Sequence, residues 1–230
     1  MTAVSSPHTP VAASPARLTR TAGIAALVAA VAYLVQPIIV FVINPETTGA
    51  GGYPVADDLL NVRGLVPLEL AEFGTVGVAT LVLVVALDRL RRSVGAESVL
   101  GTVGTLLGVV GAAGWLGAAA LTLGVYGLLA TNLGEITPDP TLQQAVIQGS
   151  LVGDGMLDLG LVGIAGWLAV LGTSGRRAGL VGWPLAIVAL VVAAGMLLPA
   201  LILLVPFGGL LIIPGFLALG IGLLVRSRAR

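Results

Sequence analysis

The chain has 230 residues, of which 57% are hydrophobic and only 10% charged, and its formal net charge is zero. A soluble domain carries roughly 25% charged residues, so this composition excludes an ordinary water-facing surface and predicts an integral membrane protein. There is no cysteine and no lysine, and the single histidine, His8, lies in a polar N-terminal segment. These absences exclude disulfides, lysine Schiff bases and histidine-bound haem or zinc within the membrane. We therefore expect no cofactor.

The first 19 residues are rich in Ser, Thr, Ala and Pro, which predicts a disordered cytoplasmic tail. The apolar run that follows, over about 21–43, is longer than the 7–15 apolar residues of a signal peptide. We therefore expect a retained first membrane helix. Residues 44–64 contain several glycines and prolines and predict a loop.

Five further apolar stretches follow along the chain. Pro67 suits the first turn of the second helix, and the third stretch is longer than a bilayer requires at 1.5 Å per residue. The sequence predicts an all-α, polytopic membrane helical bundle, a single six-helix transmembrane domain over 20–226 followed by a short basic tail at 227–230. Its expected spans are about 21–43, 67–87, 99–130, 151–171, 179–198 and 207–225.

The arginines predict the orientation of these six spans. Ten of the 11 arginines fall before the first span or after the second, fourth and sixth, and only Arg63 falls on the opposite side. Cytoplasmic loops of membrane proteins are enriched in Lys and Arg. We therefore expect both termini in the cytoplasm.

Glycines recur three or four residues apart in the third and fourth spans, where small residues allow close approach of helix backbones. Gly104 and Gly108 form one GxxxG pair, and Gly149 and Gly153 form another. Packing within the bundle is the simpler interpretation of these pairs. A seam between two copies of the chain, or with another membrane protein, is the alternative.

Four acids lie inside or at the edge of two spans. Glu69 and Glu72 are i,i+3 in the second span, and Asp154 and Asp158 are i,i+4 in the fourth, so each pair shares one helix face. Both spans run from outside to inside, which brings all four acids to the outer half of the bilayer. Glu69 has a structural interpretation too, because a carboxylate in the first turn of a helix is favoured by the helix dipole. Asp154 has one as well, if the fourth span starts late and leaves it at the interface.

Charged groups within a span are by default candidates for a functional site. Nine of the 11 acids lie outside or in the outer halves of spans, where Arg63 is the single basic residue. Arg63 pairs with one of the four acids, or burial protonates some of them, or a small ligand or cation binds. The predicted ligand- or proton-binding residues are Glu72, Asp154, Asp158, Glu69 and Arg63. The sequence leaves open whether a metal is involved, and it names no catalytic residue.

Three stretches resemble an uncharacterised six-pass family of bacterial integral membrane proteins. They are the segment RTAGIAAL from Arg20, the turn GTSGRRAGLVGWP from Gly172, and IPGFLALGIGLLVR from Ile213. The resemblance implies a six-pass fold and carries no catalytic residue, because this family has no established reaction. The abundance of Ala, Gly, Val and Arg is typical of a high-GC bacterium, so we expect the plasma membrane as the location.

Three functional hypotheses follow. The first is small-molecule or ion binding and transport through the outer acids. The second is a non-catalytic accessory subunit that packs through its glycine-rich helix faces against a second copy or another membrane protein. The third is a metal-dependent intramembrane enzyme acting on lipid. All three have the lipid bilayer as a partner, and the absence of a basic stripe with interleaved aromatics gives no support for nucleic-acid binding.

Overall fold

The computed structural model describes residues 14–38, 56–132, 140–202 and 210–229, and every regular element in them is a helix. For some helical residues, 56–72 among them, it describes the backbone but not the side chains. The elements are α1 (Pro15–Ile38), α2 (Ala56–Ser93), α3 (Val99–Asn132), α4 (Pro140–Val170), the π-helix η3 (Leu171–Gly175), α5 (Trp183–Ile202) and α6 (Ile212–Arg228). The predicted all-α class is confirmed for the described residues.

Four described segments are long and apolar enough to cross a membrane, as expected for a multi-pass membrane protein. They are Pro15–Val35, Phe73–Ser93, Val99–Gly124 and Leu151–Gly175. The described apolar part of α5, Trp183–Leu198, is shorter. At 1.5 Å per residue, roughly 20 residues are needed to cross about 30 Å of hydrocarbon.

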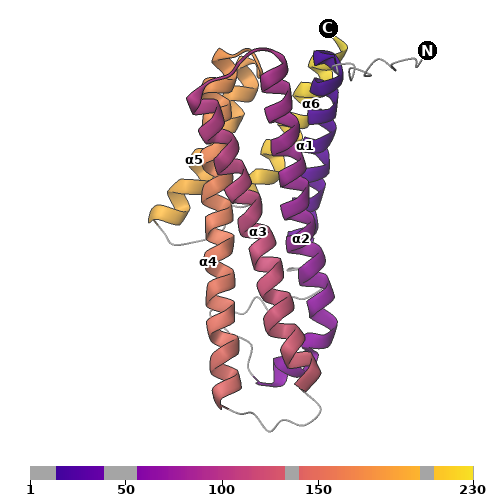
Figure 1. Ribbon diagram of the computed structural model, residues 1–230, viewed down its shortest axis with the longest axis vertical. Coiled ribbons are helices and arrows are strands. Elements are labelled where there is room, and N and C mark those ends of the chain that lie inside the picture. Colours follow the sequence, from indigo (N-terminus) through magenta and orange to yellow (C-terminus); the bar gives the residue numbers. More distant parts are fainter. Residues whose placement is uncertain (1–13, 39–55, 133–139, 203–209, 230) are drawn as a thin grey trace, which may run out of the picture.

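The helices pack in a ring in which α3 lies between α2 and α4 (Figure 1). On one side of this trio, α1 packs against α2 and α6, and on the other side α5 packs against α4 and η3. The start of α1 and the end of α6 lie at the top of the view, at the end where α2 meets α3. The contact of α5 with α6 closes the ring.

Aromatic side chains from several helices meet inside this ring. The Tyr33 ring of α1 makes edge-to-face contacts with Trp115 of α3 at 5.3 Å and with Phe216 of α6 at 5.6 Å between centroids. Trp167 of α4 makes a similar contact with Phe216. Such pairs contribute about 0.5–1.5 kcal/mol beyond their buried area, so this cluster helps to fix how α1, α3, α4 and α6 sit against one another.

Two helix starts differ from the sequence prediction. The expected tail through residue 19 ends earlier, because Ser14 caps α1 and its Oγ accepts a hydrogen bond from the Arg17 N–H. The helix α2 begins at Ala56 rather than near Pro67, so the segment 56–64 of the expected loop is helical. Five of the 11 residues from 56 to 66 are Ala, Leu or Arg, which are good helix formers, and only one is glycine, so the segment tolerates the helix that extends back through it.

The start of α4 and the turn after it also differ from expectation. The helix α4 begins at Pro140, well before the predicted start of the fourth span at about 151, and a proline loses nothing there because the first helical N–H groups have no partner. Beyond the predicted end of the fourth span at about 171, the chain stays helical through η3 and Arg177, and it reverses at Gly179, whose φ is +67°. The Leu180 N–H donates to the Gly175 carbonyl at 2.8 Å, which closes this end of the helix in the manner of a glycine C-cap.

Candidate functional site

The glycines of α3 and α4 hold these two helices at close range. A Cβ added to Gly114 would lie 2.5 Å from the Gly160 nitrogen and from the Met156 carbonyl oxygen. A Cβ added to Gly163 would lie 2.5 Å from the Gly111 nitrogen. Backbone thus meets backbone along this seam, which is the use of small residues expected in membrane helices.

The two predicted GxxxG pairs differ in their surroundings. A Cβ on Gly104 would come within 2.6 Å of Val170, and one on Gly108 within 2.6 Å of Val84, so both glycines contact other helices of the same chain. Gly149 is partly exposed. A Cβ on Gly153 would meet nothing within 4 Å among the described atoms, so the packing within the chain that was expected at Gly153 is not seen there.

The structure places Asp154 and Asp158 on the surface of α4, with both side chains exposed. The residues that contact α3 in this part of α4 are Met156 and Gly160. With 100° between successive residues of a helix, the two aspartates lie on the side of α4 away from α3. Neither carboxylate has an ion-pair partner among the residues that the structure describes.

The other three predicted site residues all belong to α2. The backbone of Arg63, Glu69 and Glu72 is helical, but their side chains lie outside the described part of the structure. Glu69 is well inside α2 rather than in its first turn, so the interpretation of Glu69 as a dipole-stabilised N-terminal carboxylate is wrong. Because α3 lies between α2 and α4, the two acid pairs are on helices that flank a third helix rather than on a directly facing pair.

A polar cluster that was not predicted from the sequence lies at the other end of the bundle. Asp88 near the end of α2 accepts hydrogen bonds from the guanidinium groups of Arg91 and Arg92, each at 2.7 Å, and from the Thr105 hydroxyl of α3 at 2.9 Å. The Arg91 side chain is 9% exposed and the Arg92 side chain 63% exposed. Arg91 also donates to the carbonyl of Ser98 at 3.3 Å, so the cluster joins α2 to the start of α3.

Two further details define this cluster. The Nε of Arg91 is buried and has no hydrogen-bond partner among the described residues. Beside Asp88 and Arg91 is a cavity of about 30 Å³, which extends to Ser174 of η3. This volume has room for one or two water molecules but for no organic solute. The arrangement therefore serves to join helices rather than to bind a substrate.

One signal in the sequence was available for this cluster. An aspartate followed by arginines three and four residues later places the charges on neighbouring positions of a helix surface. The sequence contains no signal for the burial of Arg91 or for its contact with α3, because both depend on how the next helix returns along α2.

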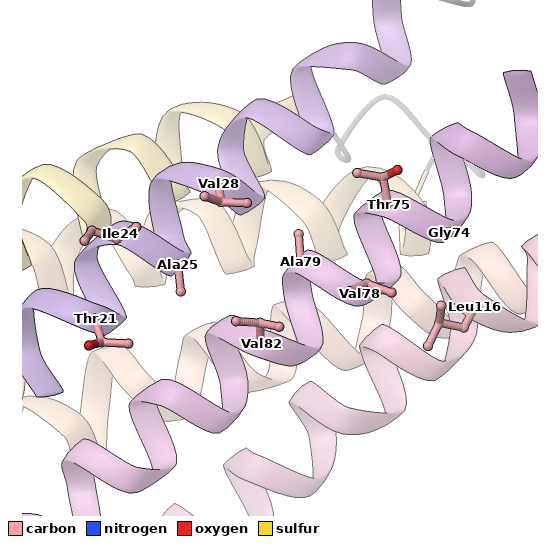
Figure 2. Close-up of a pocket in the computed structure, with 10 residues that line it drawn as sticks. All are labelled: Thr21, Ile24, Ala25, Val28, Gly74, Thr75, Val78, Ala79, Val82 and Leu116. Carbon is pink, nitrogen blue, oxygen red and sulfur yellow. The ribbon is translucent and has the colours of Figure 1, made fainter. Parts of the chain in front are cut away.

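A groove of about 700 Å³ lies between α1 and α2. Its lining comes from residues within 21–28 of α1, residues within 74–82 of α2, and Leu116 of α3 (Figure 2). Nearly all the exposed lining is apolar, and the two hydroxyls in it belong to Thr21 and Thr75. A groove of this kind suits a hydrocarbon chain rather than a polar solute.

Comparison of the chain with protein-family models, with curated proteins and with solved structures found no match. Within the described residues, no group of three or more His, Cys, Asp or Glu side chains lies close enough together to hold a metal ion.

Proposed function

We propose that the chain is a six-span protein of the bacterial plasma membrane, with both termini in the cytoplasm, that binds and transports a small ligand or ion through carboxylates in the outer half of its bundle. The bacterial origin rests on residue usage and on the resemblance to a six-pass family. The transport role rests on Asp154 and Asp158.

The topology is supported by the positions of the arginines. Arg17 lies in the first turn of α1, Arg92 at the end of α2, Arg176 just after η3 and Arg228 at the end of α6. An even number of crossings between these points would leave all of them on one side. The helices α5 and α6, with 20 and 17 residues, are about 30 Å and 25 Å long, which is close to the hydrocarbon thickness.

The absence of native cysteine makes this topology directly testable. Single cysteines at Thr47 and Thr137 are expected to react with a membrane-impermeant maleimide in intact cells. Cysteines at Ser93 and Ser227 are expected to react only after the membrane is opened. Labelling of the cysteine at Ser227 from outside would contradict the six-span arrangement.

One observation carries the binding role. Asp154 and Asp158 lie one turn apart on the same face of an apolar helix segment, Leu151–Gly175, without an ion-pair partner in the described part of the chain. A charged group in a span costs about 2.5–3.5 kcal/mol on insertion scales. Two carboxylates on one face therefore raise the free energy of membrane insertion unless a proton, a cation or a basic ligand group neutralises them. A reversible cation- or proton-binding site meets that requirement.

The two other hypotheses have less support. The accessory-subunit hypothesis requires glycine faces that are free for a partner: Gly104, Gly108 and Gly114 contact helices of the same chain, and the open position at Gly153 is what supports this hypothesis. The lipid-enzyme hypothesis requires a metal held by several acids, and the described part of the chain brings no such group together.

The test uses cation-induced stabilisation of the purified protein. A ligand that binds only the folded state at 100 times its Kd stabilises it by about 2.7 kcal/mol, which is readily measured as a shift in melting temperature. Na⁺, Mg²⁺ and a series of organic ammonium ions serve as probes, and a pH-sensitive dye inside proteoliposomes reports proton flux. The wild type is expected to respond to at least one probe, and Asp154→Asn and Asp158→Asn are expected to lose the response.

Glu97→Gln is the matched control, because Glu97 is an exposed acid in the connection between α2 and α3. This variant should keep the wild-type response. If Asp154→Asn and Asp158→Asn respond to every probe as the wild type does, the proposed function is wrong.

A further inference from the structure

The groove between α1 and α2 has a floor of small residues and walls of exposed apolar ones. Ala25 and Ala79 are buried in its floor, whereas Val28, Val78 and Val82 are each more than half exposed along its sides. Figure 2 shows these side chains along the two neighbouring helices, with Leu116 of α3 beside them. The groove therefore runs along the helix axes, and the described part of the chain leaves it uncovered.

The length of the groove corresponds to one leaflet of a bilayer. The lining stretch 74–82 of α2 rises about 12 Å at 1.5 Å per residue. One leaflet contributes about half of the ~30 Å hydrocarbon core. The groove therefore accommodates most of the depth of one acyl chain, whereas a complete membrane helix would need a complementary face about twice as long.

Three arginines lie just beyond one end of the groove. Arg17 is one turn before Thr21 on α1, and Arg20 is one turn before Ile24. On α2, Arg89 is two turns beyond Val82, so it continues the same helix face. All three side chains are exposed, and none has an ion-pair partner within the described residues.

The antiparallel course of α1 and α2 places these arginines at the same end of the groove, the end where α1 begins and α2 ends (Figure 1). Along the helix axis, Arg17 lies about 6 Å beyond Thr21 on α1, and Arg89 lies about 10 Å beyond Val82 on α2. A hydrocarbon-lined groove that ends in unpaired positive charge matches a lipid with an apolar tail and an anionic headgroup. Basic sites between helices on the cytoplasmic side of a membrane bind such headgroups.

We propose that this groove, together with Arg17, Arg20 and Arg89, is a binding site for an anionic phospholipid, with one acyl chain between α1 and α2 and the phosphate at the arginines. A second copy of the chain fits the surface less well. A two-fold dimer through this groove would bring the two arginine groups to the same membrane depth, where like charges repel. The site does not involve Asp154 or Asp158, so a test of lipid binding does not depend on the proposed transport function.

The experiment compares lipids that differ only in headgroup charge. The protein is purified in mild detergent with equal amounts of phosphatidylglycerol and phosphatidylcholine of the same chain length, and retained lipids are measured by native mass spectrometry. The wild type is expected to retain one phosphatidylglycerol in preference to phosphatidylcholine. Arg17→Gln and Arg89→Gln are each expected to reduce this preference about fivefold, the contribution of one arginine near an anionic headgroup.

A second variant tests the groove itself. Gly74 lines the groove, and a Cβ built there would meet nothing within 4 Å, so Gly74→Phe fills the groove without a clash at the helix. It should lose the retained lipid. Gly124→Phe is the matched control, because Gly124 of α3 is equally open but lies outside the groove. Arg228→Gln removes an arginine at the end of α6, a helix that contributes no residue to the groove lining. It serves as the charge control and should keep the wild-type preference for phosphatidylglycerol.

Three results would overturn the proposal. One is equal retention of the two lipids by the wild type. Another is the same lipid occupancy in the Gly74→Phe and Gly124→Phe variants. The third is a dimer in the wild-type spectrum that Gly74→Phe converts to monomer, which would show that a second copy occupies the groove.

Discussion

The guanidinium of Arg91 lies against the backbone of Gly101, the third residue of α3. A Cβ on Gly101 would overlap Nη1 of Arg91 and would lie 3.0 Å from its Cδ. The absence of a side chain at Gly101 therefore allows Arg91 to fold back between α2 and α3. From there Arg91 reaches both Asp88 and the Ser98 carbonyl.

A side chain at Gly101 is expected to destabilise the protein. Gly101→Val would force Arg91 out of its site, and overpacking of this kind costs about 1–3 kcal/mol. Thermal unfolding in detergent, followed by tryptophan fluorescence, measures the loss. Gly124→Val is the control, because a Cβ there meets nothing within 4 Å. Adding Arg91→Ala to Gly101→Val tests the cause, since the two effects should not be additive if the clash with Arg91 is the reason.

The two arginines that pair with Asp88 are expected to contribute unequally. Arg91 is 9% exposed, so Arg91→Gln leaves Asp88, itself 12% exposed, without its buried partner. Asp88 keeps its hydrogen bonds from Arg92 and Thr105, so the expected loss is about 1.5–3 kcal/mol, the contribution of a hydrogen bond to a charged group. Arg92 is 63% exposed, and a surface pair contributes about 0–1 kcal/mol. Arg92→Gln should therefore unfold close to the wild type in the same assay, and equal losses for the two variants would contradict the assigned burial.

The α3–α4 seam predicts a contrast between two neighbouring glycines. Gly114→Ala places a methyl group 2.5 Å from backbone atoms of α4, which cannot move without separating the helices. Gly117→Ala places one 3.3 Å from the flexible thioether of Met156, which can adjust. We expect Gly114→Ala to lose at least about 1–3 kcal/mol and Gly117→Ala to lose little. Resistance to SDS-induced unfolding ranks the two variants, and the reverse order would show that the seam is packed differently.

Much of the architecture could be predicted from the residues. The scarcity of charge and the length of the apolar runs predict membrane helices, and the described spans in α1, α2, α3 and α4 overlap the predicted ones. The start of α2 could not be predicted, because the glycine at position 64 and Pro67 indicate a loop and a helix start, whereas the structure continues the helix back to Ala56. The count of six spans remains a prediction.

The candidate sites divide in the same way. The sequence identified Asp154 and Asp158 as unusual, because an acid in an apolar run is conspicuous wherever it points. It did not identify Asp88 and Arg91 as a joint between helices, because an acid and an arginine three residues apart at a helix end occur equally on solvated surfaces.

The sequence by itself determined that the chain is helical, that several of its helices are long and apolar enough to cross a membrane, and where along it the charges fall, because these properties depend on local composition and length. Only the tertiary structure decided which face of each helix packs, since helices that are apolar all round carry little periodic signal to indicate a direction. It placed α3 between α2 and α4, turned Asp154 and Asp158 away from α3, and opened the groove between α1 and α2. The depth of contact at Gly114 and the burial of Arg91 followed from the same packing, because both require two backbones to come close together.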